Sequence, residues 1–121
     1  MLGIEWMGNV DMYGEDRRSV ILELFGSSPK TRVLDLFLDN PLFEFTRNEV
    51  VDALGMAKST LYEVLPELVG ASVVVETRRI GKAQLYRLND ESPVVDGIRG
   101  LIRSYVRVNA VASENLTSIV S

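Results

Sequence analysis

The side chains best suited to chemistry in this sequence come just after Gly55, where polar residues open a segment with helical spacing. They are Lys58, Ser59, Thr60 and Tyr62. A lysine can donate to guanine acceptors, and hydroxyl groups can donate to or accept from several base edges. The start of a helix also favours anions through its unpaired N–H groups. These residues could therefore contact nucleic acid, although Ser59 or Thr60 could merely cap the helix, and Tyr62 could equally pack half-buried.

A second group of cations surrounds Gly81. Arg78, Arg79 and Lys82 lie between two segments of strand-like composition, so they would occupy the turn of a β-hairpin. Arginine and lysine at such a tip can bind DNA phosphates, and they sometimes enter a narrow minor groove. A solvated turn with no partner is the plainer interpretation. The order of the surrounding elements favours DNA contact.

The residue types that the chain lacks exclude several classes of site. The sequence contains no cysteine and no histidine, which rules out disulfides, thiolate or imidazole metal sites, and nucleophiles activated by histidine. Its carboxylates show no paired arrangement, and it has no glycine-rich phosphate loop. We therefore expect no enzyme activity, no metal site and no cofactor.

Four helices are predicted ahead of the hairpin from the spacing of apolar residues. They cover residues 15–25, 29–39, 46–54 and 58–69. Thr46 and Glu49 have the spacing of a capping box, which marks the start of the third helix. Pro66 predicts a kink in the fourth helix because proline lacks an N–H group. Residues 20–25 could alternatively form a short strand.

The hairpin and a long helix complete the chain. Strands are predicted over residues 72–77 and 83–88, and a helix over residues 92–112. The last helix carries apolar residues at spacings of 4, 3, 4 and 3, namely Val94, Ile98, Leu101, Tyr105 and Val108. Because this spacing is typical of a coiled-coil seam, it predicts a homodimer joined through the helix. A stripe of cations beside the seam could be a solvated face, pair with a partner subunit or touch phosphates; it consists of Arg99, Arg103 and Arg107.

The elements follow the order of a winged helix. The segments Thr46–Leu65 and Thr77–Leu88 resemble winged-helix transcription regulators of the MarR/ArsR type, archaeal members in particular. The resemblance implies a mainly α fold with a small β-hairpin (α+β), that is, a winged helix-turn-helix with an additional N-terminal element and a long C-terminal helix. It also implies that Lys58–Val69 is a recognition helix for the major groove. The hairpin would be a wing on the flanking backbone or minor groove.

By this resemblance, the residues expected to bind DNA are Arg47, Lys58, Ser59, Thr60, Tyr62, Arg78, Arg79 and Lys82. With 13 basic and 17 acidic residues, the chain has a net charge of −4. The segment Thr46–Leu88 nevertheless has six basic against five acidic residues, so the excess acid lies outside it. We predict a homodimeric, sequence-specific regulator that binds double-stranded DNA, with any effector unknown. The acidic total and Glu63, which would repel phosphate, leave open a winged-helix protein-interaction module in a larger assembly without DNA contact.

A chain of 121 residues is expected to form one core. We divide it into a loose N-terminal segment (1–14), a winged-helix DNA-binding domain (15–91), a dimerisation helix (92–112) and a tail (113–121). The sequence shows neither a signal peptide nor an apolar run long enough to span a bilayer. The protein is therefore expected in the cytoplasm.

Overall fold

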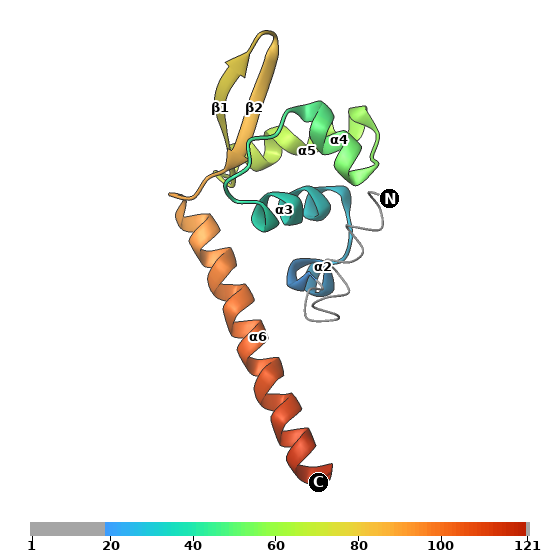
Figure 1. The fold of residues 1–121 in the computed structure, drawn as a ribbon, viewed down its shortest axis with the longest axis vertical. Coiled ribbons are helices and arrows are strands. Elements are labelled where there is room, and N and C mark those ends of the chain that lie inside the picture. Colours follow the sequence, from blue (N-terminus) through green and yellow to red (C-terminus); the bar gives the residue numbers. More distant parts are fainter. Residues whose placement is uncertain (1–18, 121) are drawn as a thin grey trace.

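A computed structural model of the chain describes the backbone of residues 19–120 and the side chains of residues 19–110. Its elements are, in chain order, α2 (Val20–Phe25), α3 (Pro29–Asp39), α4 (Arg47–Leu54), α5 (Lys58–Gly70), β1 (Val74–Ile80), β2 (Ala83–Leu88) and α6 (Pro93–Val120) (Figure 1). The two strands pair antiparallel in one sheet. The predicted fold class, mainly α with a small β-hairpin and a long C-terminal helix, is confirmed.

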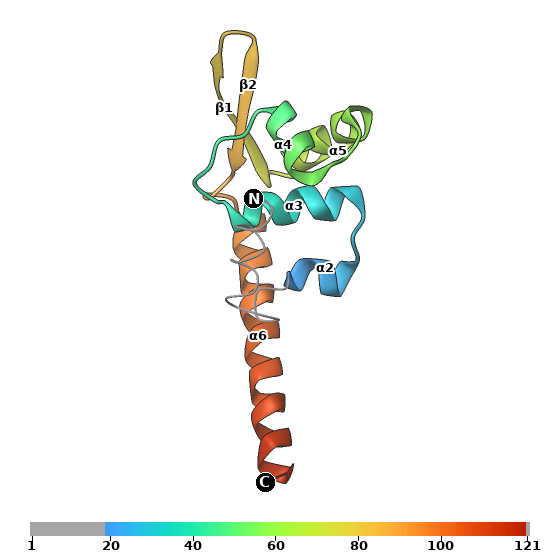
Figure 2. The ribbon, with the colours of Figure 1, turned by 45° about the vertical axis from the view of Figure 1, so that its right-hand side comes forward.

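The hairpin and α6 extend from the domain in opposite directions (Figures 1 and 2). Helices α3, α4 and α5 pack on one another between these two projections, and α2 contacts both α3 and α6. Helix α5 runs from the side of the domain away from the hairpin toward the hairpin base (Figure 1). Any surface shared by the start of α5 and the hairpin must therefore extend across the domain.

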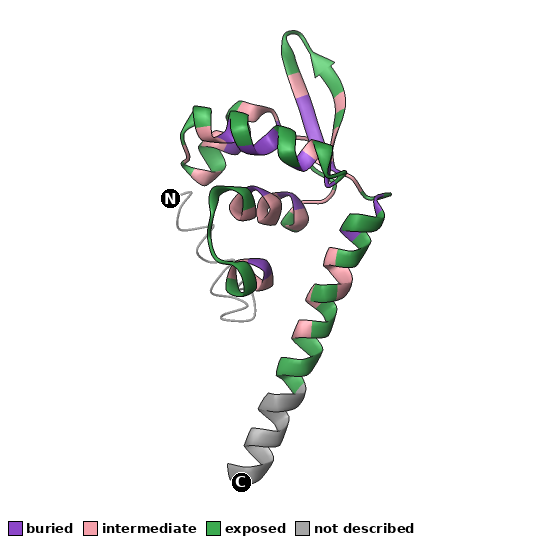
Figure 3. Cartoon of the chain, turned by 180° about the vertical axis from the view of Figure 1, so that it is seen from behind, coloured by how far each residue is buried: buried purple, intermediate pink, exposed green. Residues whose placement is uncertain are grey.

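One hydrophobic core joins the helices to the hairpin (Figure 3). Val33 and Phe37 of α3, Leu61 of α5 and Leu88 of β2 are all 0% exposed. The same core contains Val95 at the start of α6, which is also fully buried and which the predicted seam did not include. Fixed packing therefore sets the positions of α5, the hairpin and the root of α6 relative to one another.

Local signals explain where α4 begins and ends. The predicted capping box is present, since the Thr46 hydroxyl accepts from the Glu49 N–H at 3.1 Å and the Glu49 carboxylate accepts from the Thr46 N–H at 2.8 Å. Gly55 follows the helix at φ 61°, a left-handed conformation that glycine adopts without steric cost. The sequence thus predicts the turn between α4 and α5 correctly.

The bounds of β1 and the end of α6 differ from the prediction. Strand β1 covers Val74–Ile80 rather than residues 72–77, so Arg78 and Arg79 lie in the strand and not in the turn. Helix α5 passes through Pro66 and ends at Gly70, within one residue of the predicted end, because loss of one N–H group does not interrupt a helix whose other face is buried. The kink predicted at Pro66 stays a prediction. Helix α6 continues to Val120, past the predicted end at residue 112.

The described part of the N-terminal region contains a helix. Helix α2 begins at Val20, after Ser19, whose hydroxyl accepts from the Leu22 N–H at 3.1 Å. The strand alternative for residues 20–25 is therefore wrong. The segment predicted to be loose, residues 1–14, lies outside the described residues. No helix in the described part of the chain is long and apolar enough to cross a membrane.

Candidate nucleic-acid interface

The first turns of α5 present polar side chains to solvent because the opposite face of the helix is buried. Leu61, Val64, Leu65 and Leu68 form the buried face. Lys58 and Ser59 are exposed, and Tyr62 is 49% exposed. Ala57 at the N-cap provides no side-chain hydrogen bond. The start of α5 therefore has unpaired backbone N–H groups and exposed polar side chains available to bind DNA.

Ser59 and Thr60 form no side-chain hydrogen bond among the described residues, so neither acts as a helix cap there.

Glu67, further along α5, forms an ion pair with Lys30 of α3, whose Nζ lies 2.8 Å from the glutamate Oε1. Because both side chains are more than half exposed, this pair contributes about 0–1 kcal/mol at most. It nevertheless directs Glu67 toward α3.

A β-bulge divides the cations of the hairpin between two faces. Glu76 pairs with Tyr86 and Arg79 pairs with Gln84, so Thr77 and Arg78 together oppose the single residue Leu85. Cross-strand partners share a face, and an extra residue reverses the alternation that follows it. We name the face with Glu76, Arg79, Lys82, Gln84 and Tyr86 the inner face, and that with Arg78, Ile80, Leu85 and Arg87 the outer face.

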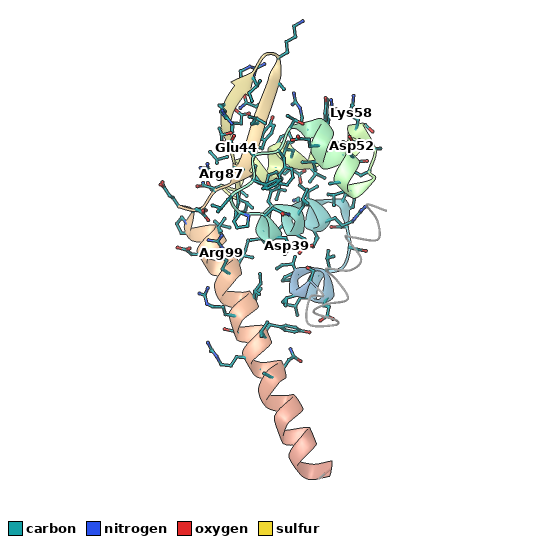
Figure 4. All side chains as sticks on the ribbon, viewed as in Figure 1. Asp39, Glu44, Asp52, Lys58, Arg87 and Arg99 are labelled. Carbon is teal, nitrogen blue, oxygen red and sulfur yellow. The ribbon has the colours of Figure 1, made fainter. Side chains whose placement is uncertain are left out.

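On the outer face, a carboxylate offsets the arginines. The Arg78 Nε donates to the Glu44 Oε1 at 2.8 Å, and the Arg87 Nη1 lies 4.0 Å from the other oxygen of the same carboxylate. Glu44 and Arg87 lie together at the base of the hairpin (Figure 4). DNA phosphate would have to compete with Glu44 for Arg78.

On the inner face, the cations have only neutral partners among the described residues. The Arg79 guanidinium donates to the Gln84 side-chain oxygen at 3.2 Å and to the Lys82 carbonyl at 3.3 Å. Gln84 in turn donates to the Arg78 carbonyl at 3.2 Å, which ties the two strands together at the bulge. Lys82 forms no ion pair with any described residue. Glu76 lies on the same face but forms no ion pair with either cation, so the charges of Arg79 and Lys82 are available to an anion.

Arg47 connects the start of α4 with α5 and the inner face. Its guanidinium carbon lies 4.8 Å from the ring centre of Tyr62 and 6.0 Å from that of Tyr86. Backbone hydrogen bonds of 2.8 Å in both directions join Phe45 to Tyr86 immediately before α4. The sequence assigned Arg47 to DNA only by resemblance, and nothing in the linear pattern indicated that two tyrosines distant in sequence would stack on it.

Three predicted site residues meet in one cavity of about 260 Å³ between α4 and the inner face. The cavity is lined by Thr46, Arg47, Asn48, Tyr62, Lys82, Ala83 and Gln84. Asn48, which follows Arg47 in α4, and Gln84 were not predicted, and only the folded hairpin brings Gln84 to the site. Lys58 lies at the far end of α5, away from the hairpin (Figure 4). A ligand that contacts all the predicted residues must therefore be extended, as a duplex is.

The predicted seam of α6 is divided between two environments. Ile98 is partly buried against the core, and the Tyr105 hydroxyl donates to a Glu23 carboxylate oxygen at 3.0 Å. Val94, Leu101 and Val108 are 45%, 40% and 65% exposed. They recur every seven residues, so they form a stripe along one side of the helix. Of the predicted seam, this stripe is the part open to another molecule.

The cation stripe of α6 begins with a residue that has a partner. Arg99 pairs with Asp90 at 2.9 Å, which ties α6 to the loop before it. Within the described residues, no group of three carboxylates lies close enough to hold a metal ion.

No protein-family model and no curated protein sequence matches the chain. Solved structures do. Mycobacterium tuberculosis Rv0081 has a TM-score of 0.53 at 22% identity, over 79% of this chain and 89% of that one. The adhesin competence repressor of Streptococcus pyogenes has a TM-score of 0.50 at 8% identity, over 96% and 80%. With the element order above, this similarity establishes a winged-helix fold.

A third similar structure, the ferric uptake regulator of Francisella tularensis with iron, has a TM-score of 0.48 at 22% identity. The match covers 55% of this chain, which spans only 54% of the regulator's length.

Proposed function

We propose that this chain is a transcription regulator that binds double-stranded DNA as a homodimer, rather than an enzyme. The observation that carries the proposal is the surface formed by the start of α5, Arg47 and the inner face of the hairpin. It is polar, and its cations Arg47, Arg79 and Lys82 have no carboxylate partner among the described residues. Arg79 and Lys82 are exposed and Arg47 is half-buried. Cations without carboxylate partners beside the polar start of a helix are suited to a polyanionic duplex.

In the proposed complex, the start of α5 enters the major groove. Lys58, Ser59 and Thr60 lie within the first turn, the part of a recognition helix that reaches base edges. Lys58 donates to guanine acceptors, and the hydroxyls form hydrogen bonds with base edges or phosphates. Glu63 is exposed on the same helix, where it accepts from a cytosine amino group.

The hairpin is the proposed wing. Arg79 and Lys82 on the inner face contact the flanking backbone or minor groove. Arg78 contributes less, because it lies on the outer face and Glu44 already offsets its charge. The division of the chain into a DNA-binding domain at 15–91 and a dimerisation helix at 92–112 belongs to the same proposal, with α6 adding length to the second part.

Dimerisation is proposed through the exposed stripe of α6, formed by Val94, Leu101 and Val108, together with α2. Leu24 and Phe25 of α2 are 40% and 61% exposed, and α2 packs beside α6. Isologous pairing of such a surface buries apolar area on both copies. It would set the two copies of α5 about 34 Å apart, the spacing of successive major grooves.

From the sequence resemblance, we further propose that the chain is a regulator of the MarR/ArsR type, similar to archaeal members in particular, and that it acts in the cytoplasm. The adhesin competence repressor is by name a repressor, which is in keeping with a regulatory role for the fold. We assign no effector to the chain.

A gel shift of the intact chain against random genomic fragments at two salt concentrations tests the function. We expect retained DNA at the lower concentration and loss of most of it at the higher, because phosphate contacts release counterions. Failure to shift any fragment at either concentration would contradict the proposal.

One observation favours a second function, a protein-interaction module. Leu42, Phe43 and Ile80 are 82%, 61% and 58% exposed and border a cavity of about 660 Å³ on the outer face. Exposed apolar residues gathered around a cavity are typical of a protein contact. If the gel shift is negative while a Leu42→Ser, Phe43→Ser variant loses a partner that the intact chain retains, this second function replaces the first.

A further inference from the structure

The Arg47 side chain is held in position without a carboxylate. Among the described residues it forms no ion pair, whereas Arg78, Arg87 and Arg99 each have an acidic neighbour. Arg47 instead lies against the rings of Tyr62 and Tyr86, at 4.8 and 6.0 Å from their centres. A cation above aromatic rings is oriented by them while its charge stays uncompensated.

The backbone that carries Arg47 is also fixed. Phe45 exchanges two backbone hydrogen bonds of 2.8 Å with Tyr86, so the chain is attached to β2 two residues before Arg47. The capping box of Thr46 and Glu49 then sets the first turn of α4 around it. Arg47 is thus restrained both at its backbone and along its side chain, and little conformational entropy is left to lose when it binds a ligand.

The cavity beside Arg47 has the chemistry of an anion site. Lys82 supplies a second cation and the Asn48 side-chain amide supplies a neutral donor, whereas the Gln84 amide already donates to the Arg78 and Leu85 carbonyls. None of the residues that line this cavity is acidic. Its volume of about 260 Å³ accommodates a tetrahedral oxyanion with its substituents. The neighbouring cavity of about 380 Å³ contains Glu76, which makes it a poorer anion site.

We propose that the cavity between α4 and the hairpin receives one backbone phosphate of DNA, and that Tyr62 and Tyr86 hold the Arg47 guanidinium in position for that phosphate. The inference rests on the proposed function and deepens it. Tyr62 is thereby a positioning residue rather than a reader of bases. It ties the recognition helix to the backbone contact, so that α5 and the phosphate site engage the duplex as one unit.

A double-mutant cycle on DNA binding tests this role, using the intact chain and a duplex that it retains. Arg47→Ala and Tyr62→Ala should each weaken binding about tenfold, the effect of losing one charge-assisted hydrogen bond. The double variant should bind about as weakly as Arg47→Ala alone, because Tyr62 acts through Arg47. Independent, additive losses in the double variant would overturn the inference.

Two conservative variants guard against a folding defect. Tyr62→Phe keeps the ring and should bind within about twofold of the intact chain, while Arg47→Lys keeps the charge but loses the planar contact and should recover binding only in part. The salt slope should fall by about 0.9 in Arg47→Ala and stay unchanged in Tyr62→Phe. Thermal unfolding of each protein confirms that it is folded.

Selection from a randomised DNA pool separates positioning from base reading. Tyr62→Ala should select the same sequence as the intact chain, and a changed preference would show that Tyr62 reads bases. If the intact chain binds DNA and the cycle is additive, only the phosphate site fails. If the intact chain binds no DNA, the proposed function fails with it.

Discussion

Both faces of the hairpin carry arginine side chains, but only on the outer face do they pair with a carboxylate. On the outer face, Arg78 and Arg87 share the Glu44 carboxylate beside exposed apolar residues. On the inner face, Arg79 donates only to neutral oxygens, and Lys82 borders a cavity that contains no acid. A cation indicates an anion-binding surface only where no carboxylate of the protein already offsets its charge. The bulge opposite Leu85 determines which arginine lies on which face.

The largest effect should come from separating the two copies, so that each duplex meets one inner face instead of two. Replacing Leu101 and Val108 by Glu places charges on the exposed stripe of α6, and it should convert the dimer to a monomer in light scattering. DNA affinity should fall by roughly 100-fold or more, because the second contact is no longer intramolecular.

Ala110→Glu, at an exposed position on the opposite side of the same helix, is the control for added charge. If the intact chain scatters as a monomer, the proposed dimer is wrong. If the double variant remains dimeric with full affinity, the interface lies elsewhere.

A direct comparison of the faces uses two double variants with the same change in charge. Arg79→Ala with Lys82→Ala should lower affinity for all sequences about 10- to 100-fold and reduce the salt slope by about 1.8, for two phosphate contacts. Arg78→Ala with Arg87→Ala should change the slope little, since Glu44 already holds both arginines. Fluorescence anisotropy across a salt series measures both. Equal losses from the two variants would remove the distinction between the faces.

Base preference should depend on the start of α5 rather than on the hairpin. Lys58→Ala and Thr60→Ala should each flatten preference at individual base pairs by roughly 1–3 kcal/mol, while affinity for unrelated DNA changes little. Glu67→Ala should leave preference intact, because Glu67 pairs with Lys30 of α3. Selection from a randomised pool reports this, and a new preference in Glu67→Ala alone would place the recognition surface elsewhere.

The smallest effect should come from Glu44→Gln, which releases the outer-face arginines. Two cations then become available near the duplex, so affinity for all sequences should rise about twofold at low salt and return to that of the intact chain at high salt. A weaker complex at low salt would mean that the pairing of Glu44 with Arg78 supports the wing.

The sequence predicted most helices because each is marked by local signals. The capping box at Thr46 and the glycine at residue 55 act through their nearest neighbours in the chain, so they can be recognised without the fold. The strand boundary at residues 78–80 could not be found this way. It depends on cross-strand pairing and a bulge, which the composition around Gly81 does not encode.

The candidate site was predicted as a set of residues and not as an arrangement. Lysines and arginines were recognisable by type, but whether each has a carboxylate partner depends on residues far away in the chain, as Glu44 is from Arg78. The same holds for the stack of Arg47 on Tyr62 and Tyr86. On α6, spacing indicated five seam residues, and tertiary packing decided that Ile98 faces the core while Leu101 stays exposed.

The most direct test of the account is an NMR titration of the isotopically labelled intact chain with a duplex that it retains in the gel shift. We predict that amide resonances of Arg47, Lys58 and Lys82 shift or broaden on addition of DNA, while those of Leu42 and Ile80 on the opposite side of the hairpin stay in place. Changes confined to Leu42, Ile80 and their surroundings would contradict the claim that the inner face and the start of α5 bind DNA.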